Sequence, residues 1–180
     1  VILYLNKREF KIESPMPVQI LSGKQLEKLN SLSVADAIRY FSGVQLKDYG
    51  GIGGLKTINV RSLGSAHTAV FYDGMTVGNA QNGQVDLGKY SLDNIEAIEL
   101  YNGQKSSIFQ PARGFFASNT LFLRSKTPEF KKDKSTNVRT ALKTGSFGLF
   151  NPSLLLEQKL SQKTSFTTSL EWTKADGHYK

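Results

Sequence analysis

Side chains able to catalyse a reaction are few in this sequence, and their spacing does not favour catalysis. Asp93, Glu96 and Glu99 form an acidic cluster, and paired carboxylates are what general acid–base catalysis often uses. Glu96 and Glu99, however, are an odd number of positions apart on one predicted strand, so their side chains point to opposite faces. The cluster therefore does not predict an acid–base pair.

Nucleophilic and metal-binding groups are also scarce. The sequence has no cysteine and only 2 histidines, which removes disulfides, thiolate zinc sites and thiol nucleophiles. His67 lies between Ser65 and Thr68 and is most simply a polar loop residue. We therefore expect no enzyme activity, no metal site and no bound cofactor.

The glycine-rich stretch Gly50–Gly54 is a candidate binding loop. A phosphate-binding loop leads into a helix, and a Walker motif ends in Gly-Lys-Ser/Thr. Here the β-prone residues 57–60 follow instead, which disfavours nucleotide binding. Two interpretations stay open: a turn that only connects two strands, or a loop that contacts a ligand with Tyr49 as a flat apolar platform.

A second candidate is the amide-rich segment that contains Asn79, Gln81, Asn82 and Gln84. Amides both donate and accept hydrogen bonds, so they suit a hydroxyl- or amide-rich ligand better than a bare metal ion. A solvated loop is the simpler interpretation. Phe115 and Phe116, which follow Arg113, are expected to pack rather than to bind ligand.

Composition indicates a folded protein with a basic surface. Of 180 residues, 39% are hydrophobic and 21% are charged, and the net charge is +8. This charge permits nucleic acid or anionic lipid as a partner, but no aromatic residues alternate with Lys131, Lys132 and Lys134 as a stacking platform would require. No apolar run approaches the roughly 18 residues of a membrane helix.

The elements that must position these residues form a predicted α+β domain over 1–128, with a small mixed sheet and short helices. Extended geometry is expected over 17–21, followed by a helix capped by Ser22 and a second helix over 34–41 capped by Ser33. Asp73-Gly74 between β-forming residues predicts a hairpin. Further strands are expected over 44–47, 57–61, 95–101 and 120–124.

The pattern changes after a lysine-rich linker over 129–137. From 138 to 180 apolar and polar residues alternate in three segments separated by turns. Segments of about ten residues with this alternation are typical of transmembrane barrel strands. The sequence therefore predicts two or three antiparallel strands of an incomplete barrel.

The order of these motifs resembles the plug domain of TonB-dependent outer-membrane receptors, followed by their first barrel strands. The resemblance covers residues from about 15 to 127. It is carried by seven segments in the family's order: 17–18 with the helix begun at Ser22, 34–39 with 42–44, 58–61, 70–74, 95–100 with Gly103, 107–109, and 121–126.

The resemblance implies a receptor that imports a scarce, bulky nutrient, such as an iron chelate, cobalamin or a glycan. It places the protein in the outer membrane of a Gram-negative bacterium, with the plug in the barrel lumen and lipid around the complete barrel. A TonB-type energy-transducing protein would capture a segment upstream of Val1 by strand addition. The barrel of such a receptor has about 22 strands, so residues 138–180 are expected to be its first few.

For individual residues, the resemblance implies ligand contact through two apical plug loops. The residues concerned are Tyr49, Gly50, Gly51 and Ile52 in one loop and Asn79, Gln81 and Asn82 in the other.

A plug–barrel contact is implied for Arg61. In the family, two plug arginines pair with glutamates of the barrel wall, and here Asn102 stands where the second is expected. Ser62 likewise replaces the glycine that usually follows the first arginine, and Gln110-Pro111 replaces a third glycine turn. The sequence thus retains at most one of the two arginine–glutamate pairs that the resemblance implies.

Two alternatives remain at this point. One is a non-transporting soluble α+β module that binds a protein or glycan through the same loops. The other is a basic nucleic-acid-binding domain, which is the runner-up to the receptor, although we expect no nucleic acid as a partner.

Overall fold

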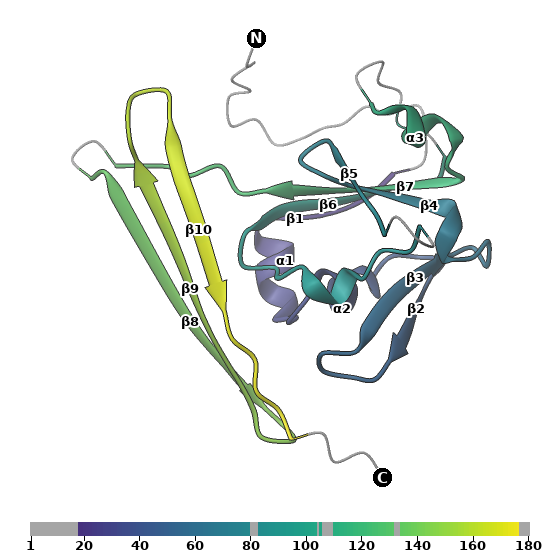
Figure 1. Ribbon diagram of the computed structural model, residues 1–180, viewed down its shortest axis with the longest axis horizontal. Helices are drawn as coiled ribbons and strands as arrows, with labels where there is room; N and C mark the ends of the chain where they lie inside the picture. Colours follow the sequence, from purple (N-terminus) through teal and green to yellow (C-terminus); the bar gives the residue numbers. More distant parts are fainter. Residues whose placement is uncertain (1–17, 80–82, 104, 106–109, 132–133, 177–180) are drawn as a thin grey trace.

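The computed structural model describes residues 18–79, 83–103, 105, 110–131 and 134–176. Figure 1 shows a compact part, residues 18–126, beside a long three-stranded sheet, residues 136–171, which we call the C-terminal sheet. No helix within the described ranges is long and apolar enough to cross a membrane.

A five-stranded mixed sheet organises the compact part, in the order β1-β6-β7-β4-β5. Only the β4–β7 pair is parallel; the other neighbours are antiparallel. The strands are β1 Val18–Ser22, β4 Thr68–Tyr72, β5 Met75–Val77, β6 Ile95–Tyr101 and β7 Asn119–Ser125. The predicted small mixed sheet is confirmed.

A separate antiparallel hairpin and five short helical segments complete the described part of the compact domain. The hairpin consists of β2 Val44–Tyr49 and β3 Leu55–Val60. The helices are α1 Lys24–Leu29, α2 Val34–Ile38 and α3 Ala112–Phe116, and the 3-10 turns are η1 Ser65–His67 and η2 Leu87–Lys89.

The main core lies between α2, the hairpin and one face of the mixed sheet. Val34 and Ile38 of α2 are fully buried with Val60 of β3, Ile98 of β6 and Leu121 of β7. The cluster removes several large aliphatic side chains from water, at about 25 cal/mol for each Å² buried. This packing holds the short α2 in place, since a five-residue helix is not stable alone.

The two predicted helix caps differ in outcome. The Ser33 side chain accepts a hydrogen bond from the Asp36 amide and caps α2 as expected. Ser22, in contrast, does not cap α1, because it is the last residue of β1 and pairs with Ala97 of β6. Gly23 occupies the cap position of α1 without a side-chain bond, so the strand ladder takes precedence over the cap.

The expectation that Phe115 and Phe116 pack is wrong for Phe116, whereas Phe115 is partly covered at 42% exposed. They belong to α3, a helix that the sequence analysis did not predict, and Phe116 is 90% exposed. The buried residue of this helix is Gly114, where an added Cβ would lie 3.3 Å from Phe71. Since neighbouring helix residues lie about 100° apart, the two phenylalanines turn away from that contact.

The C-terminal sheet comprises β8 Thr136–Gly145, β9 Leu149–Lys159 and β10 Ser165–Glu171, in the order β10-β9-β8. Its register places Thr140, Leu154 and Leu170 side by side on one face. The neighbouring row on that face is Val138, Leu156 and Thr168. The predicted alternation is therefore confirmed.

The two faces of this sheet differ in chemistry. Large apolar side chains are exposed on one face: Val138, Leu142, Phe150, Leu154, Phe166 and Leu170. The other face carries Lys143, Asn151, Ser153, Glu157 and Glu171, together with the buried Leu155. A sheet with such faces fits between an apolar and a polar environment.

The turn after β3 contains Ser62 at the position where the resemblance leads us to expect glycine, and its backbone conformation is unfavourable for serine. Arg61 and Ser62 both have left-handed backbones, with φ of 50° and 60°, and the Leu63 amide donates to the Val60 carbonyl at 3.1 Å. Residues other than glycine lose about 1 kcal/mol in this conformation.

We therefore predict that Ser62→Gly raises the free energy of unfolding by about 0.5–1 kcal/mol. Urea unfolding of the chain in detergent measures the change. The matched control is Ser42→Gly, because Ser42 has no left-handed backbone and the added chain entropy should lower stability there. Equal or lower stability of Ser62→Gly would contradict the prediction.

Candidate functional site

The tip of the β2–β3 hairpin is the first predicted ligand-contacting loop. The hairpin projects from the compact part in the direction of the β8–β9 turn (Figure 1). Tyr49 is 61% exposed, and Ile52 and Leu55 at the same tip are also exposed. The hairpin tip therefore exposes one aromatic ring and two aliphatic side chains on its surface.

Glycines determine the shape of this tip. Gly51 and Gly53 have φ of 66° and 83°, which other residues rarely adopt. At Gly54, an added Cβ would lie 2.7 Å from the backbone of Gly50, so the two strand ends approach as closely as the chain allows. The Gly51 amide also donates to Asp48 Oδ1 at 2.8 Å. The loop is therefore a defined turn, and β3 rather than a helix follows it, unlike in a phosphate-binding loop.

Lys56 connects the hairpin to the rest of the compact part. Its Nζ lies 3.0 Å from Asp36 Oδ1 of α2 and 3.9 Å from Asp48 Oδ2 of β2. Its backbone amide donates to Asp86 Oδ1, next to η2, at 3.0 Å. The contacts with Asp36 and Asp86 join residues 20 and 30 positions apart, and no local pattern in the sequence indicates them.

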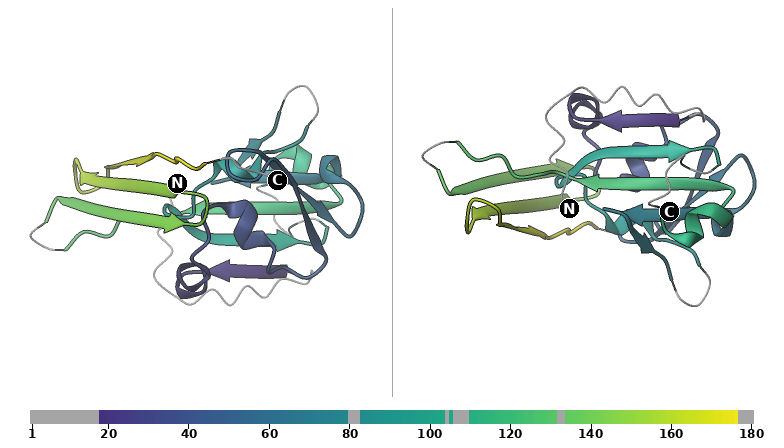
Figure 2. Two further views of the ribbon diagram at one scale, coloured as in Figure 1. Left: turned by 90° about the horizontal axis from the view of Figure 1, so that it is seen from below. Right: turned by 90° about the horizontal axis from the view of Figure 1, so that it is seen from above.

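The second predicted loop, which contains Asn79 and Gln84, is held by hydrogen bonds at its base and to α3. The Asn79 amide donates to the Gln84 carbonyl at 3.2 Å, which closes the base of the segment. Arg113 Nη2 donates to the Gly83 carbonyl at 3.4 Å, so the segment rests on α3. In Figure 2 the described ends of this segment, on either side of residues 80–82, leave the compact part separately from the β2–β3 hairpin. Gln81 and Asn82 lie outside the described residues.

Arg61, the predicted barrel contact, lies at the opposite end of β3 from the hairpin tip. Its amide donates to the Gly43 carbonyl at 2.8 Å, and its side chain is exposed. None of the ion pairs found between described residues joins it to the C-terminal sheet. Its contact with a barrel wall stays a prediction.

A buried charge cluster surrounds Glu99, and no local pattern in the sequence predicts it. This carboxylate is only 2% exposed and receives Arg124 Nε at 2.8 Å, Lys105 Nζ at 3.3 Å and the Tyr101 hydroxyl at 3.1 Å. Burial, together with the charge and hydrogen bond of Glu99, raises the pKa of Tyr101 well above its ordinary value. Lys105 also lies 4.7 Å from the centre of the Phe122 ring.

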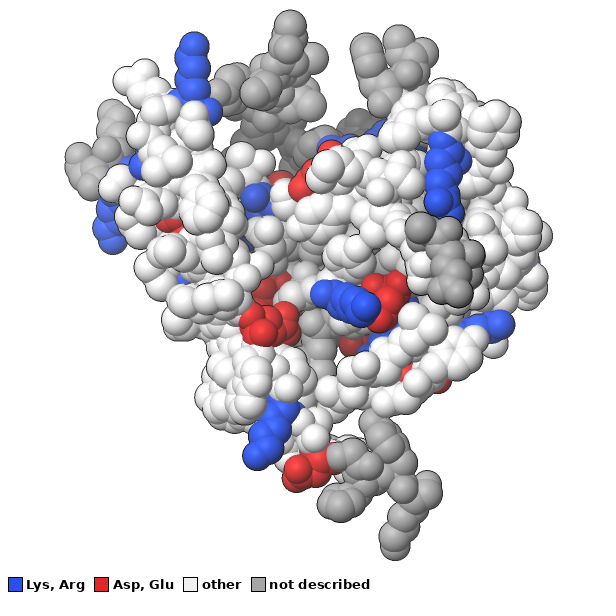
Figure 3. Space-filling view, viewed as in Figure 1, with Lys and Arg blue, Asp and Glu red and all other residues white. Residues whose placement is uncertain are grey.

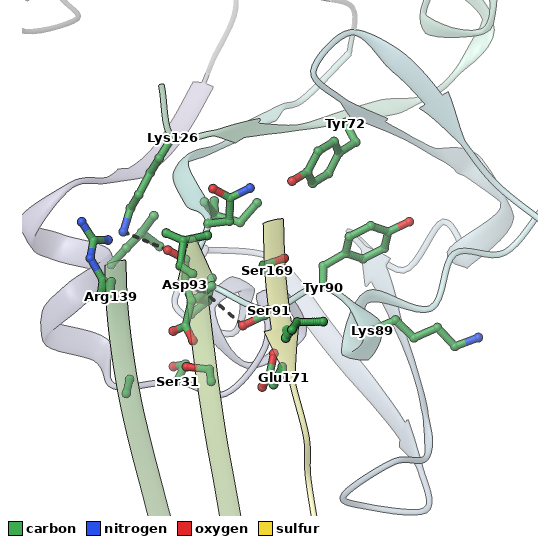
Figure 4. A pocket seen from close by; sticks show the side chains of 18 of the residues that line it. Ser31, Tyr72, Lys89, Tyr90, Ser91, Asp93, Lys126, Arg139, Ser169 and Glu171 are labelled. Atoms are coloured by element: carbon green, nitrogen blue, oxygen red, sulfur yellow. Dashed lines mark hydrogen bonds between the residues drawn. The ribbon is translucent and has the colours of Figure 1, made fainter. Parts of the chain in front are cut away.

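A cavity of about 1100 Å³ separates the compact part from the polar face of the C-terminal sheet. Figure 3 shows acidic and basic side chains gathered around this hollow. Figure 4 shows Lys126 and Arg139 side by side at one end, with Tyr72 and Tyr90 toward the other. Burial raises the pKa of both tyrosines. Among the described residues, no group of three or more acidic or histidine side chains could hold a metal ion.

Comparison with protein families decides what this arrangement is. A model described as the TonB-dependent receptor plug domain matches residues 11–115. The chain belongs to this family. The compact part is accordingly a plug, and the C-terminal sheet follows it in the chain.

Curated relatives of the plug are vitamin B12 transporters. The chain is 27% identical over 110 residues to the vitamin B12 transporter BtuB of Photobacterium profundum and 29% identical over 111 residues to that of Vibrio vulnificus. Each match covers 61% of this chain and 18% of the relative. The relatives are thus several times longer than the matched segment.

Solved structures show the same fold over more of the chain. FpvA of P. aeruginosa, bound to heterologous pyoverdines, superposes with a TM-score of 0.69 at 16% identity, and the copper transporter OprC with 0.66 at 14%. Each covers 91% of this chain and less than a quarter of its own length, 21% and 24%. Because the plug occupies less of the chain than that, the likeness extends into the C-terminal sheet.

The Glu99 cluster provides a test of plug stability. Arg124→Met should lower the free energy of unfolding by about 3 kcal/mol, because it removes the closest cation from a buried carboxylate. Urea unfolding in detergent measures it, with Arg39→Met, an exposed arginine after α2, as the matched control. If both variants unfold at the same urea concentration, Glu99 does not depend on Arg124.

Proposed function

We propose that this chain is the plug and first wall strands of an outer-membrane receptor that imports a scarce, bulky nutrient. In this proposal the plug, residues 1–128, closes the barrel pore until an iron chelate, cobalamin or glycan binds. Residues 129–137 link it to the wall, which begins with 138–180. The observation that carries the proposal is plug-family membership together with a following sheet that is apolar on one face only.

The relatives support transport rather than catalysis. The BtuB proteins are vitamin B12 transporters, OprC is a copper transporter, and FpvA was solved with pyoverdines. None of these names indicates an enzyme, and none supports the alternative of a soluble binding module or a nucleic-acid-binding domain. The nutrient itself stays open, since these relatives carry different cargoes.

The proposal includes specific partners and a location. The receptor lies in the outer membrane of a Gram-negative bacterium, where the apolar face of the C-terminal sheet contacts lipid. A TonB-type protein captures a segment upstream of Val1 by strand addition. No nucleic acid, metal cofactor or prosthetic group takes part.

Ligand contact is proposed for two loops of the plug. Tyr49, Gly50, Gly51 and Ile52 form an apolar platform whose backbone shape is fixed by glycines. Asn79, Gln81 and Asn82 supply amide hydrogen bonds from the second loop. A rigid turn loses little conformational entropy on binding, which favours affinity.

Growth of a deletion strain on single sources of iron, cobalamin or glycan identifies the nutrient. We expect growth to fail on one source and to be restored by the full-length gene that contains this segment. Growth on every source at wild-type rates, in a strain without redundant receptors, would contradict the proposed import.

Once the nutrient is known, Tyr49→Ala combined with Ile52→Ala should weaken its binding to the purified receptor roughly tenfold to a hundredfold. Titration calorimetry measures the affinity. Tyr40→Ala is the matched control, because Tyr40 is 63% exposed but lies after α2, away from the hairpin tip. Unchanged affinity of the double variant would remove the hairpin tip from the ligand site.

A further inference from the structure

Asp93 joins the plug to the C-terminal sheet. It lies between η2 and β6, and its Oδ1 is 2.9 Å from Nζ of Lys143 on β8. Ser153 of β9 lies close to the same carboxylate, whose second oxygen, Oδ2, is buried without a hydrogen-bond partner among the described residues. The side chains of Lys143 and Asp93 are only 17% and 23% exposed. A shielded pair of this kind is stronger than an ion pair on an open surface.

The charges around Asp93 make its carboxylate the bridging group. Burial favours the neutral acid, but Lys143, the Ser153 hydroxyl and Lys126 outweigh it and lower the pKa of Asp93. Lys126 Nζ donates to the Asp93 backbone carbonyl at 3.2 Å. Arg139 of β8 lies beside Lys126 (Figure 4).

Without the Asp93 charge, cations of the plug and of the sheet would face each other. Burial and the repulsion from Arg139 already lower the pKa of Lys126. The acidic groups that face Lys126, Glu27 from the plug and Glu157 from β9, offset part of this repulsion. Glu157, however, is engaged with Asn137 at 3.1 Å, which leaves Asp93 as the carboxylate directly paired across the junction with Lys143.

We infer that the Asp93–Lys143 pair is a latch that holds the plug against the first wall strands. Its polarity is the reverse of the expected family contact, because the carboxylate is on the plug and the cation is on the wall. It lies beside the 1100 Å³ cavity, so separating the pair enlarges an existing space between plug and wall. The inference rests on the proposed function, in which this sheet begins the barrel.

The latch also lies on the path of a pull from the N-terminal side. β1 is the first described strand, and all five of its residues pair with β6, from Val18–Tyr101 to Ser22–Ala97. The Gly23 amide continues the ladder to the Glu96 carbonyl at 3.1 Å. Asp93 precedes β6 by two residues, so force applied ahead of β1 reaches the latch through one hydrogen-bonded strand pair.

The test uses the full-length receptor in outer membranes and in planar bilayers, with no nutrient present. Asp93→Asn and Lys143→Met should each increase ion conductance and sensitivity to a large antibiotic about fivefold, the size expected for one coupled pair. Lys143→Arg, which keeps a cation opposite Asp93, should leave conductance close to the parent value. Lys159→Met, at the exposed end of β9, should leave it unchanged.

Two results would overturn the latch: Asp93→Asn and Lys143→Met receptors that conduct no more than the parent, or a Lys143→Arg receptor that leaks as much as Lys143→Met. Resistance of the folded barrel to SDS without heating checks that each variant has assembled. Nutrient uptake is measured separately. Variants that leak in a receptor that imports nothing would refute the proposed function and leave the latch standing.

Discussion

A sheet with one apolar and one polar face requires two different surroundings, and the rest of this structure depends on that requirement. Antiparallel pairing places Thr140, Leu154 and Leu170 in one row, so apolar residues from three strands form a continuous surface. The plug covers only the opposite face. The sheet therefore turns its polar side chains toward the plug and its hydrocarbon side chains away from it. This is the arrangement of a barrel wall.

The plug tolerates the buried charges of Glu99 and Lys56 because each has partners. Glu99 is surrounded by Arg124, Lys105 and Tyr101, and Lys56 bridges Asp36 and Asp48. A buried charge without such partners would cost several kcal/mol. These clusters fix the register of β6 with β7 and the position of the β2–β3 hairpin. They therefore position the predicted ligand tip from within the plug.

Local chemistry explains what the sequence predicted correctly. Asp73-Gly74 forms the expected hairpin turn, with φ of 47° and 84°, and Ser33 caps α2, because both features depend on adjacent residues. Competition between local signals explains the Ser22 error, where strand pairing excludes the cap. Helix α3 was missed because Pro111 and Gly114 read as turn residues, although Gly114 is what allows the close contact with Phe71. Contacts such as Asp93–Lys143 join residues 50 positions apart and leave no periodic signal.

The central claim is that the C-terminal sheet separates lipid from a plugged lumen. This segment contains no cysteine, so single cysteines for spin labels can be introduced here once any cysteine elsewhere in the full-length receptor has been replaced. In the full-length receptor in lipid bilayers, labels at Leu142, Leu154 and Leu170 should be relaxed by oxygen dissolved in lipid. Labels at Ala141 and Ser169 should be protected from it. Equal oxygen accessibility at both sets of positions would contradict the account.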